Sequence, residues 1–222
     1  MNLEAFETIL KDLEPYKAQL VAVSKTKPND DILAFYNNGQ RIFGENKVQE
    51  LGGKYELLPK DIKWHFIGHL QRNKVKYIAP FINLMHGVDS LRLFKEIDKQ
   101  AKKVDRNIDI LCQMHIAEEE TKFGLNQEEL IELLDYSAST VDCRVNITGL
   151  MGRATNTSST QQVSKEFAQL QSIFEKVKGD DFQGRESFKE LSMGMSGDYK
   201  IALDHGSTLV RIGSSLFGKR NY

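Results

Sequence analysis

The sequence carries almost no net charge, few cysteines and no long hydrophobic run. Its 30 Lys and Arg residues nearly balance its 31 Asp and Glu residues, which gives a formal net charge of −1 at pH 7. Such a balance exerts no long-range attraction on phosphate backbones or anionic lipids and argues against nucleic-acid or membrane partners. No apolar run approaches the about 18 residues that span a bilayer, and the N-terminus is acidic where a signal peptide is basic. We therefore expect a small-molecule ligand and a cytoplasmic location.

Cysteine and proline are also scarce, with two cysteines and four prolines. Cys112 and Cys143 lie far apart in apolar stretches, without Cys-x-x-Cys spacing or a histidine at ligand spacing beside them. We expect two reduced thiols in the core, no disulfide and no metal site. The prolines are isolated and no Pro/Ser/Gly-rich linker divides the chain, which predicts one domain over residues 1–222.

Short apolar or β-branched runs alternate with polar turns and amphipathic stretches, a pattern typical of βα units with parallel strands. The expected strands are 20–24, 41–43, 64–67, 84–88, 110–115, 147–151, 190–193 and 209–212. The clearest expected helices are 126–140, capped by Asn126, 158–178, capped by Ser158, and 2–18, which would plug or flank the bottom of a barrel. Eight such units in 222 residues predict an α/β fold, a single (β/α)8 TIM barrel with an extra N-terminal helix.

Lys25 is the strongest candidate for chemistry. Val21, Val23 and Lys25 share one face of the first expected strand, so Lys25 would point toward the mouth of the barrel. Removal from water lowers the pKa of a lysine ammonium and yields an amine that can form a Schiff base with an aldehyde or ketone. Taken alone, the spacing more often means a lysine that ends a strand and reaches solvent.

Glycines and serines follow the last two expected strands. Gly194 and Ser196 stand in one loop, and Gly213 and Ser214 in the other, where many TIM barrels bind phosphate. Glycine lets backbone N–H groups approach an anion, and serine adds a hydroxyl donor. Each element alone is typical of an ordinary turn, but the two together with a lysine after the first strand favour a phosphate site.

Two further polar residues stand in otherwise apolar strands. Arg211 lies between Val210 and Ile212, and a buried guanidinium needs an acceptor. It either pairs with an interior carboxylate or faces a ring nitrogen or carboxylate of a ligand. His65, beside Trp64, either stacks on a ligand ring or is an ordinary core histidine, which the sequence alone favours.

Several motifs follow one another in a fixed order over nearly the whole chain. They include Ala22-Val23-Ser24-Lys25-Thr26-Lys27-Pro28, Phe43-Gly44-Glu45-Asn46, Trp64-His65-Phe66-Ile67-Gly68, Glu120-Thr121-Lys122-Phe123-Gly124, Leu191-Ser192-Met193-Gly194-Met195-Ser196 and Val210-Arg211-Ile212-Gly213. In these motifs the chain resembles the pyridoxal phosphate homeostasis proteins, a family with the alanine racemase N-terminal-like barrel fold. It departs from the family at Met151-Gly152-Arg153, where other members are often more apolar.

The resemblance implies a barrel of fold type III that lacks the C-terminal β domain, with pyridoxal 5′-phosphate as the cofactor. The implied cofactor-binding residues are Lys25, Asn46, His65, Ser196, Arg211, Gly213 and Ser214. By this resemblance, Lys25 carries the internal aldimine and Arg211 faces the pyridine nitrogen. Ser196, with the residues after the last strand, holds the phosphate, and Asn46 and His65 lie near the ring.

Three functions are compatible with these residues: a carrier that buffers or delivers pyridoxal 5′-phosphate in vitamin B6 homeostasis, a racemase-like enzyme that uses this cofactor, and a Schiff-base aldolase without a cofactor. Fold relatives that racemise or decarboxylate add a second domain with an acid or base, whereas only ten residues follow Ile212 here. We therefore predict a carrier with little or no turnover and no catalytic residue. We expect a monomer in transient contact with enzymes that need the cofactor.

Overall fold

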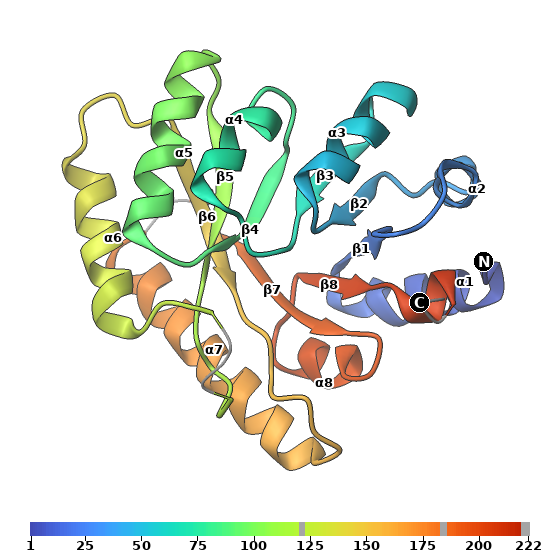
Figure 1. Cartoon of the computed structure of the whole chain (residues 1–222). Coiled ribbons are helices and arrows are strands. Elements are labelled where there is room, and N and C mark those ends of the chain that lie inside the picture. Colours follow the sequence, from blue (N-terminus) through green and yellow to red (C-terminus); the bar gives the residue numbers. More distant parts are fainter. Residues whose placement is uncertain (120–122, 183–185, 219–222) are drawn as a thin grey trace.

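The chain folds into a closed barrel of parallel strands surrounded by helices (Figure 1). This computed structural model describes residues 1–119, 123–182 and 186–218, so Glu120, Thr121 and Lys122 of one sequence motif lie outside the described residues. The strands, in barrel order, are β1 (Gln19–Val23), β2 (Ile42–Glu45), β3 (Lys63–Phe66), β4 (Leu84–Val88), β5 (Ile108–Gln113), β6 (Val145–Met151), β7 (Glu190–Met195) and β8 (Leu209–Ile212). β8 pairs with β1 and closes the ring, which confirms the predicted TIM barrel.

Helices join successive strands and form the outer layer (Figure 1). In chain order they are α1 (Leu3–Leu13), the 3-10 helix η1 (Glu14–Tyr16), α2 (Asn29–Asn37), α3 (Val48–Leu57), the 3-10 helix η2 (Arg72–Lys74), α4 (Val75–Ile78), α5 (Leu91–Lys103), α6 (Gln127–Ser139), α7 (Thr160–Asp180), α8 (Tyr199–Asp204) and α9 (Ser214–Phe217). The capping box predicted for α6 is present: Asn126 and Glu129 each bind the backbone N–H of the other with the side chain. The cap of α7 is Ser159 and not Ser158, because Ser159 Oγ accepts from the N–H of Gln162.

The expected strand ends differ from the observed ones by up to two residues. The fifth strand was expected over 110–115 and runs from Ile108 to Gln113. Beyond it the chain leaves the ladder, because Met114 forms only an isolated bridge with Leu125. The seventh strand continues to Met195, past the expected end at 193.

The N-terminal helix flanks the side of the barrel and does not plug its bottom. The N–H of Asn2 donates to the carbonyl of Leu216 in α9, so α1 starts beside the end of β8. Its buried face carries Phe6, whose ring centroid lies 5.2 Å from that of Phe35. Phe35 in turn lies 4.8 Å from Phe217. This aromatic cluster, assembled from three distant segments, fixes the helix in the outer layer.

Two hydrophobic clusters hold the barrel together. The larger one fills the space between the strands and the surrounding helices and includes large buried side chains such as Trp64 and Phe167. The smaller one lies inside the barrel and consists of Val21, Leu84, Leu111, Met151 and Leu209. Val21 is therefore an inward-facing residue of β1, and the alternation along that strand turns Val23 the same way.

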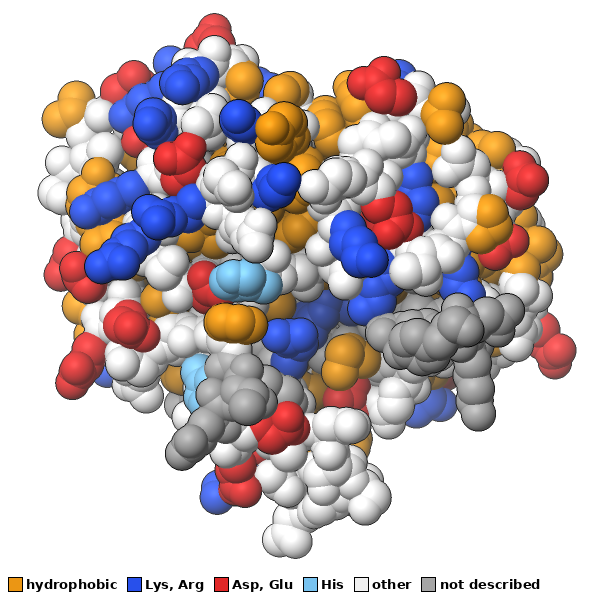
Figure 2. Space-filling model, viewed as in Figure 1, with side chains coloured by type: hydrophobic (Ala, Val, Ile, Leu, Met, Phe, Trp, Pro, Cys, Tyr) orange, Lys and Arg blue, Asp and Glu red, His pale blue; other side chains and the backbone are white. Residues whose placement is uncertain are grey.

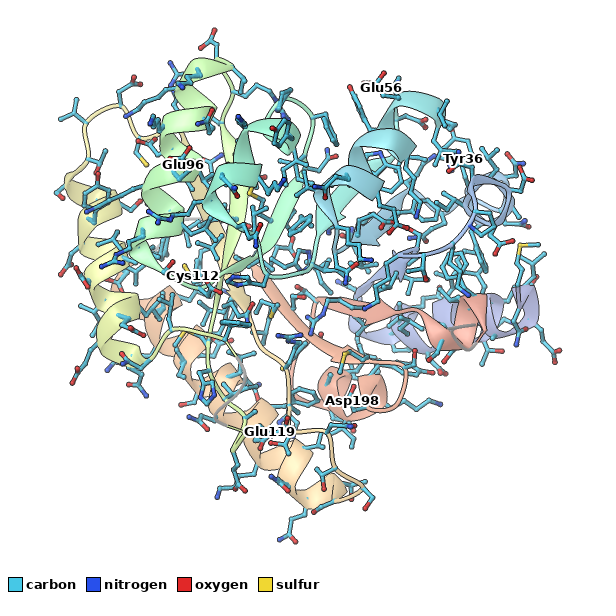
Figure 3. The ribbon with its side chains drawn as sticks, in the orientation of Figure 1. Tyr36, Glu56, Glu96, Cys112, Glu119 and Asp198 are labelled. Atoms are coloured by element: carbon cyan, nitrogen blue, oxygen red, sulfur yellow. The ribbon has the colours of Figure 1, made fainter. Side chains whose placement is uncertain are left out.

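The two cysteines differ in burial. Cys112 lies among the central strands (Figure 3), and burial raises the pKa of its thiol to about 12. Cys143 is only half-buried, so the prediction of two core thiols holds for Cys112 alone. None of the helices in the described ranges has the length and apolar content needed to cross a membrane.

Candidate functional site

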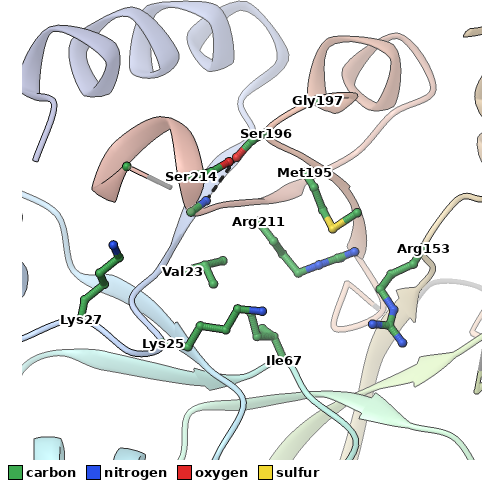
Figure 4. A pocket seen from close by; sticks show the side chains of 12 residues that line it. Val23, Lys25, Lys27, Ile67, Arg153, Met195, Ser196, Gly197, Arg211 and Ser214 are labelled. Carbon is green, nitrogen blue, oxygen red and sulfur yellow. Dashed lines mark hydrogen bonds between the residues drawn. The ribbon is translucent and has the colours of Figure 1, made fainter. Parts of the chain in front are cut away.

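A cavity of about 340 Å³ lies at the mouth of the barrel, at the carboxyl ends of the strands (Figure 4). In the space-filling view it is a hollow near the centre of the face shown, with Lys and Arg side chains on its floor (Figure 2). Its described lining residues are Val23, Lys25, Lys27, Ile67, Arg153, Met195, Ser196, Gly197, Arg211, Gly213, Ser214 and Gly218. In this architecture such a position is where ligands bind.

Lys25 enters the cavity from the end of β1, two residues beyond the inward-facing Val23. Its side chain runs across the floor of the cavity toward Ile67 (Figure 4). Lys27 also lines the cavity, but its Nζ donates a hydrogen bond of 2.9 Å to the carbonyl of Phe217 and points away from Lys25 (Figure 4). The two lysines of this segment therefore have different surroundings.

A buried charged network holds the backbone on both sides of Lys25. Lys54 Nζ donates to Glu45 Oε1 and Glu50 Oε1, each at 2.7 Å, and to the carbonyl of Ser24 at 2.8 Å. Glu45 Oε1 also accepts from the hydroxyl of Ser24, and Glu50 Oε1 accepts from the backbone N–H of Thr26.

Thr26 needs this support because its φ of 63° lies in the left-handed region, which residues with a Cβ rarely adopt. Sequence reasoning missed the network. The i,i+4 spacing of Glu50 and Lys54 on one helix was the available signal.

The opposite end of the cavity carries hydroxyl and backbone donors. Ser196 follows β7, and Gly213 and Ser214 form the start of α9 after β8. The N–H of Gly213 lies 3.4 Å from Ser196 Oγ, which brings the two loops together (Figure 4). A Cβ at position 213 would lie 3.2 Å from Cβ of Val23, so glycine lets the start of α9 pack closely against the end of β1. The first N–H groups of a helix lack partners within it and can bind an anion.

Arg211 reaches the cavity from the middle of β8 and is almost fully buried. Its Nη1 donates to Ser192 Oγ at 2.6 Å, and its Nη2 donates to the carbonyl of Gly152 at 3.0 Å. Burial lowers the pKa of Arg211 to about 10, so the guanidinium is still charged at pH 7. Among the described residues, its hydrogen-bond acceptors are a hydroxyl and a carbonyl, and not the interior carboxylate that one reading of the sequence required.

A hydrogen-bonded chain continues from Arg211 into the barrel. His86 Nδ1 lies 2.9 Å from Ser192 Oγ, and His86 Nε2 lies 3.0 Å from His65 Nδ1. Arg211 donates to Ser192 Oγ, and further hydrogen bonds link Ser192 with His86 and His86 with His65. Burial lowers the pKa of His65 to about 3 and that of His86 well below its usual range. Both rings are therefore neutral at pH 7.

Two of the predicted site residues do not line the cavity. His65 faces a second pocket at the other end of the barrel, beside residues at the strand starts such as Gln19 and Asn83. Asn46 follows β2, and its buried Oδ1 has no hydrogen-bond partner among the described residues. The structure brings together the other five predicted residues, which are Lys25, Ser196, Arg211, Gly213 and Ser214.

His65 and His69 stand four residues apart, a spacing that could suggest a metal site. Their rings diverge, because His69 Nδ1 lies 2.9 Å from Asp89 Oδ2 and its ring stacks on Phe123 near the surface. Within the described ranges, no group of three or more His, Cys, Asp and Glu side chains is placed to hold a metal ion.

The donor set of the cavity fits a phosphorylated aldehyde such as pyridoxal 5′-phosphate. Four cationic side chains line the cavity, from Lys25, Lys27, Arg153 and Arg211, and the described lining includes no carboxylate. Hydroxyl and backbone donors at Ser196 and α9 suit a phosphate, while the lysine amine suits an aldehyde. Val23, Ile67 and Met195 supply apolar walls for a ring.

Comparison with known proteins agrees with this geometry. The family model for the alanine racemase N-terminal domain matches residues 2–221. A pyridoxal phosphate homeostasis protein of Aquifex aeolicus is 39% identical over 206 residues, which is 92% of this chain and 88% of the relative. The human pyridoxal phosphate homeostasis protein is 37% identical over 223 residues, 96% of this chain and 80% of the relative.

Solved structures show the same barrel. PipY of Synechococcus elongatus, solved with pyridoxal phosphate bound, is 35% identical with a TM-score of 0.86, and the match covers 97% of this chain and 99% of PipY. Alanine racemase from Bartonella henselae shares the fold at 17% identity and a TM-score of 0.70, with 98% of this chain matching 60% of the racemase. The chain therefore belongs to the alanine racemase N-terminal domain family and, within it, to the pyridoxal phosphate homeostasis proteins.

Proposed function

We propose that this protein binds pyridoxal 5′-phosphate covalently through Lys25 and buffers or delivers it, with little or no catalytic turnover. The observation that carries the proposal is the single cavity shared by Lys25, Arg211 and the serine and glycine donors of the last two loops. The names of the similar proteins, and the bound cofactor of PipY, support the same conclusion.

The residues have separate tasks in this proposal. Lys25 supplies the amine that bonds to the aldehyde carbon of the cofactor. Ser196 Oγ and the backbone N–H groups of Gly213 and Ser214 bind the phosphate. Arg211 would donate toward the ring nitrogen and, because a guanidinium only donates, would leave that nitrogen without a proton. When bound, the cofactor supplies a reactive aldehyde and an electron-withdrawing ring, which is a weaker electron sink while its nitrogen is unprotonated.

Low turnover is supported by what lines the cavity. A racemase needs an acid or base on each face of the reacting carbon. The described lining residues include lysines and arginines but no His, Asp, Glu, Tyr or Cys. Delivery would involve transient contact with enzymes that lack their cofactor. We propose that the protein does this as a monomer in the cytoplasm, where free thiols such as its own two cysteines are usual.

The covalent bond is tested by borohydride reduction of the cofactor-loaded protein, followed by intact mass measurement and peptide mapping. Wild type should carry one reduced adduct on the peptide that contains Lys25, and Lys25→Ala should carry none. Lys27→Ala is the matched control and should keep the adduct, because Lys27 already binds the carbonyl of Phe217. An adduct on Lys27 or on another lysine would contradict the assignment.

Turnover is tested by solvent-deuterium exchange at Cα of alanine and serine, followed by NMR at high protein concentration. Loss of one positioned acid or base lowers a rate by about 10²- to 10⁴-fold, so we expect exchange far slower than ordinary enzyme turnover. Exchange at about 1 s⁻¹ or faster, the low end of typical turnover, would identify an enzyme and overturn this part of the proposal.

A further inference from the structure

Arg153 is a cation of the cavity wall that the proposed cofactor contacts do not use. It follows β6 and extends into the cavity at the side away from Ser196 and Ser214 (Figure 4). Its Nε is buried and has no hydrogen-bond partner among the described residues. The residue as a whole is only half-buried and lines the cavity, so its positive charge is open to an anion bound there.

The backbone on both sides of Arg153 is anchored. The N–H of Gly152 donates to the carbonyl of Ser192 at 3.1 Å. On the other side, the buried carboxylate of Glu166 accepts from the N–H of Thr155 at 2.6 Å and from its hydroxyl at 2.7 Å. These contacts hold the backbone of the segment from which the Arg153 side chain extends into the cavity.

The charge of the cavity points to a second anion beside the phosphate. Arg153 and Arg211 lie close enough that the charge of Arg153 adds to the effect of burial in lowering the pKa of Arg211. Two neighbouring guanidinium groups repel each other, and an anion between them removes that repulsion. The phosphate of the proposed cofactor belongs at the serine end, which leaves the side of Arg153 for another negatively charged group.

Chemistry restricts what that group is. A primary amine can replace Lys25 at the aldehyde carbon: its nitrogen bonds to that carbon, the bond to Lys25 Nζ breaks, and the released lysine amine takes up the proton. A planar guanidinium fork binds a carboxylate with two parallel hydrogen bonds. An α-amino acid carries both groups on one carbon. We propose that Arg153 binds the carboxylate of α-amino acids, and so makes the loaded pocket prefer amino acids to amines that lack a carboxylate. This inference rests on the proposed cofactor binding.

The test titrates cofactor-loaded protein with L-alanine and with L-alaninamide, which has the same amine and side chain but no charge on its carboxamide. The absorption spectrum of the bound cofactor reports the reaction with each amine. Arg153→Gln should raise the half-saturating concentration of L-alanine at least tenfold, about 1.4 kcal/mol, and change that of L-alaninamide less than twofold. Arg153→Lys should lie between wild type and Arg153→Gln for L-alanine, because it keeps the charge but loses the fork.

Lys27→Gln is the matched control, because it removes a different positive charge from the same cavity. Lys27→Gln should change the half-saturating concentrations of L-alanine and L-alaninamide by the same factor. The inference would be overturned if Arg153→Gln raised the half-saturating concentrations of both ligands equally. It would also be overturned if the wild-type protein did not prefer L-alanine to L-alaninamide. In those cases the loaded protein still has its cofactor spectrum, and the proposed function stands. A wild-type protein that takes up no cofactor contradicts the proposed function and this inference together.

Discussion

Replacing Lys54 by methionine removes the cation at the centre of the buried network beside Lys25. The side chains of Lys54 and Glu45 are 7% and 0% exposed, so the variant leaves the carboxylate of Glu45 buried without its counter-ion. The hydroxyl of Ser24 would then be its one remaining partner in this network, since Glu45 Oε2 has no hydrogen bond among the described residues. Methionine retains most of the methylene stem, so the change is mainly one of charge.

The expected loss follows from the burial of the pair. Removing one partner of a buried ion pair costs about 3–5 kcal/mol, because the other charge stays in a place from which water is excluded. Domains are stable by about 5–15 kcal/mol, so Lys54→Met should still fold but unfold at clearly lower urea concentration. Because the carbonyl of Ser24 loses the hydrogen bond from Lys54, the fraction of Lys25 that attaches cofactor should also fall.

The pH dependence separates lost charge pairing from lost packing. Burial raises the pKa of Glu45, and Lys54 opposes that rise. Without Lys54 the pKa of Glu45 rises further. A raised folded-state pKa contributes stability at low pH, and this contribution is lost as the pH rises through that pKa. The deficit of Lys54→Met relative to wild type should therefore be larger at pH 8 than at pH 5.

Urea unfolding followed by circular dichroism at both pH values measures this deficit. Glu50→Gln is the matched control, because its side chain is 22% exposed and an amide oxygen can still accept from Thr26. Glu50→Gln should lower the free energy of unfolding by at most about 1 kcal/mol, as expected for a partly exposed ion pair. A loss below about 1 kcal/mol in Lys54→Met, or a deficit that does not shrink at pH 5, would refute the reasoning.

Two other predictions concern the phosphate end and the histidine chain. Ser196→Ala should weaken the binding of pyridoxal 5′-phosphate about tenfold or more but change the binding of unphosphorylated pyridoxal little, because it removes a donor at the phosphate alone. Titration of both ligands measures this, and equal losses of affinity would show that Ser196 does not contact the phosphate. His65 and His86 have lowered pKa values, so each contributes stability that is lost as the pH falls below about 6.5. His65→Gln should therefore reduce the fall in unfolding free energy between pH 7 and pH 5, by up to about 1.4 kcal/mol per pH unit, and an unchanged fall would contradict the assignment.

The barrel could be predicted because its strands are buried on both sides. Such strands appear in a sequence as short apolar runs between turns, and each of the eight was found within about two residues. The place of α1 could not be predicted. It depends on contacts between Phe6, Phe35 and Phe217, which are close only in the folded chain. The register shift between Ser192 and Met195, where β7 pairs with β8, was likewise invisible in the apolar pattern.

In the candidate site, too, the sequence predicts only part of the arrangement. Alternation along a strand determines whether a side chain points into the barrel, and it predicts this for Lys25 after Val23 and for His65 before Ile67. Lys25 and Ile67 line the cavity, whereas His65 faces the pocket at the other end. His65 lies within β3, one residue before its end, whereas Lys25 lies two residues beyond the end of β1, so the two inward residues reach different depths. Depth also depends on reach, and the long side chain of Arg211 extends to the cavity while the ring of His65 ends at His86. Sequence therefore determines the inward direction of these groups, and the folded barrel determines which of them meet a ligand.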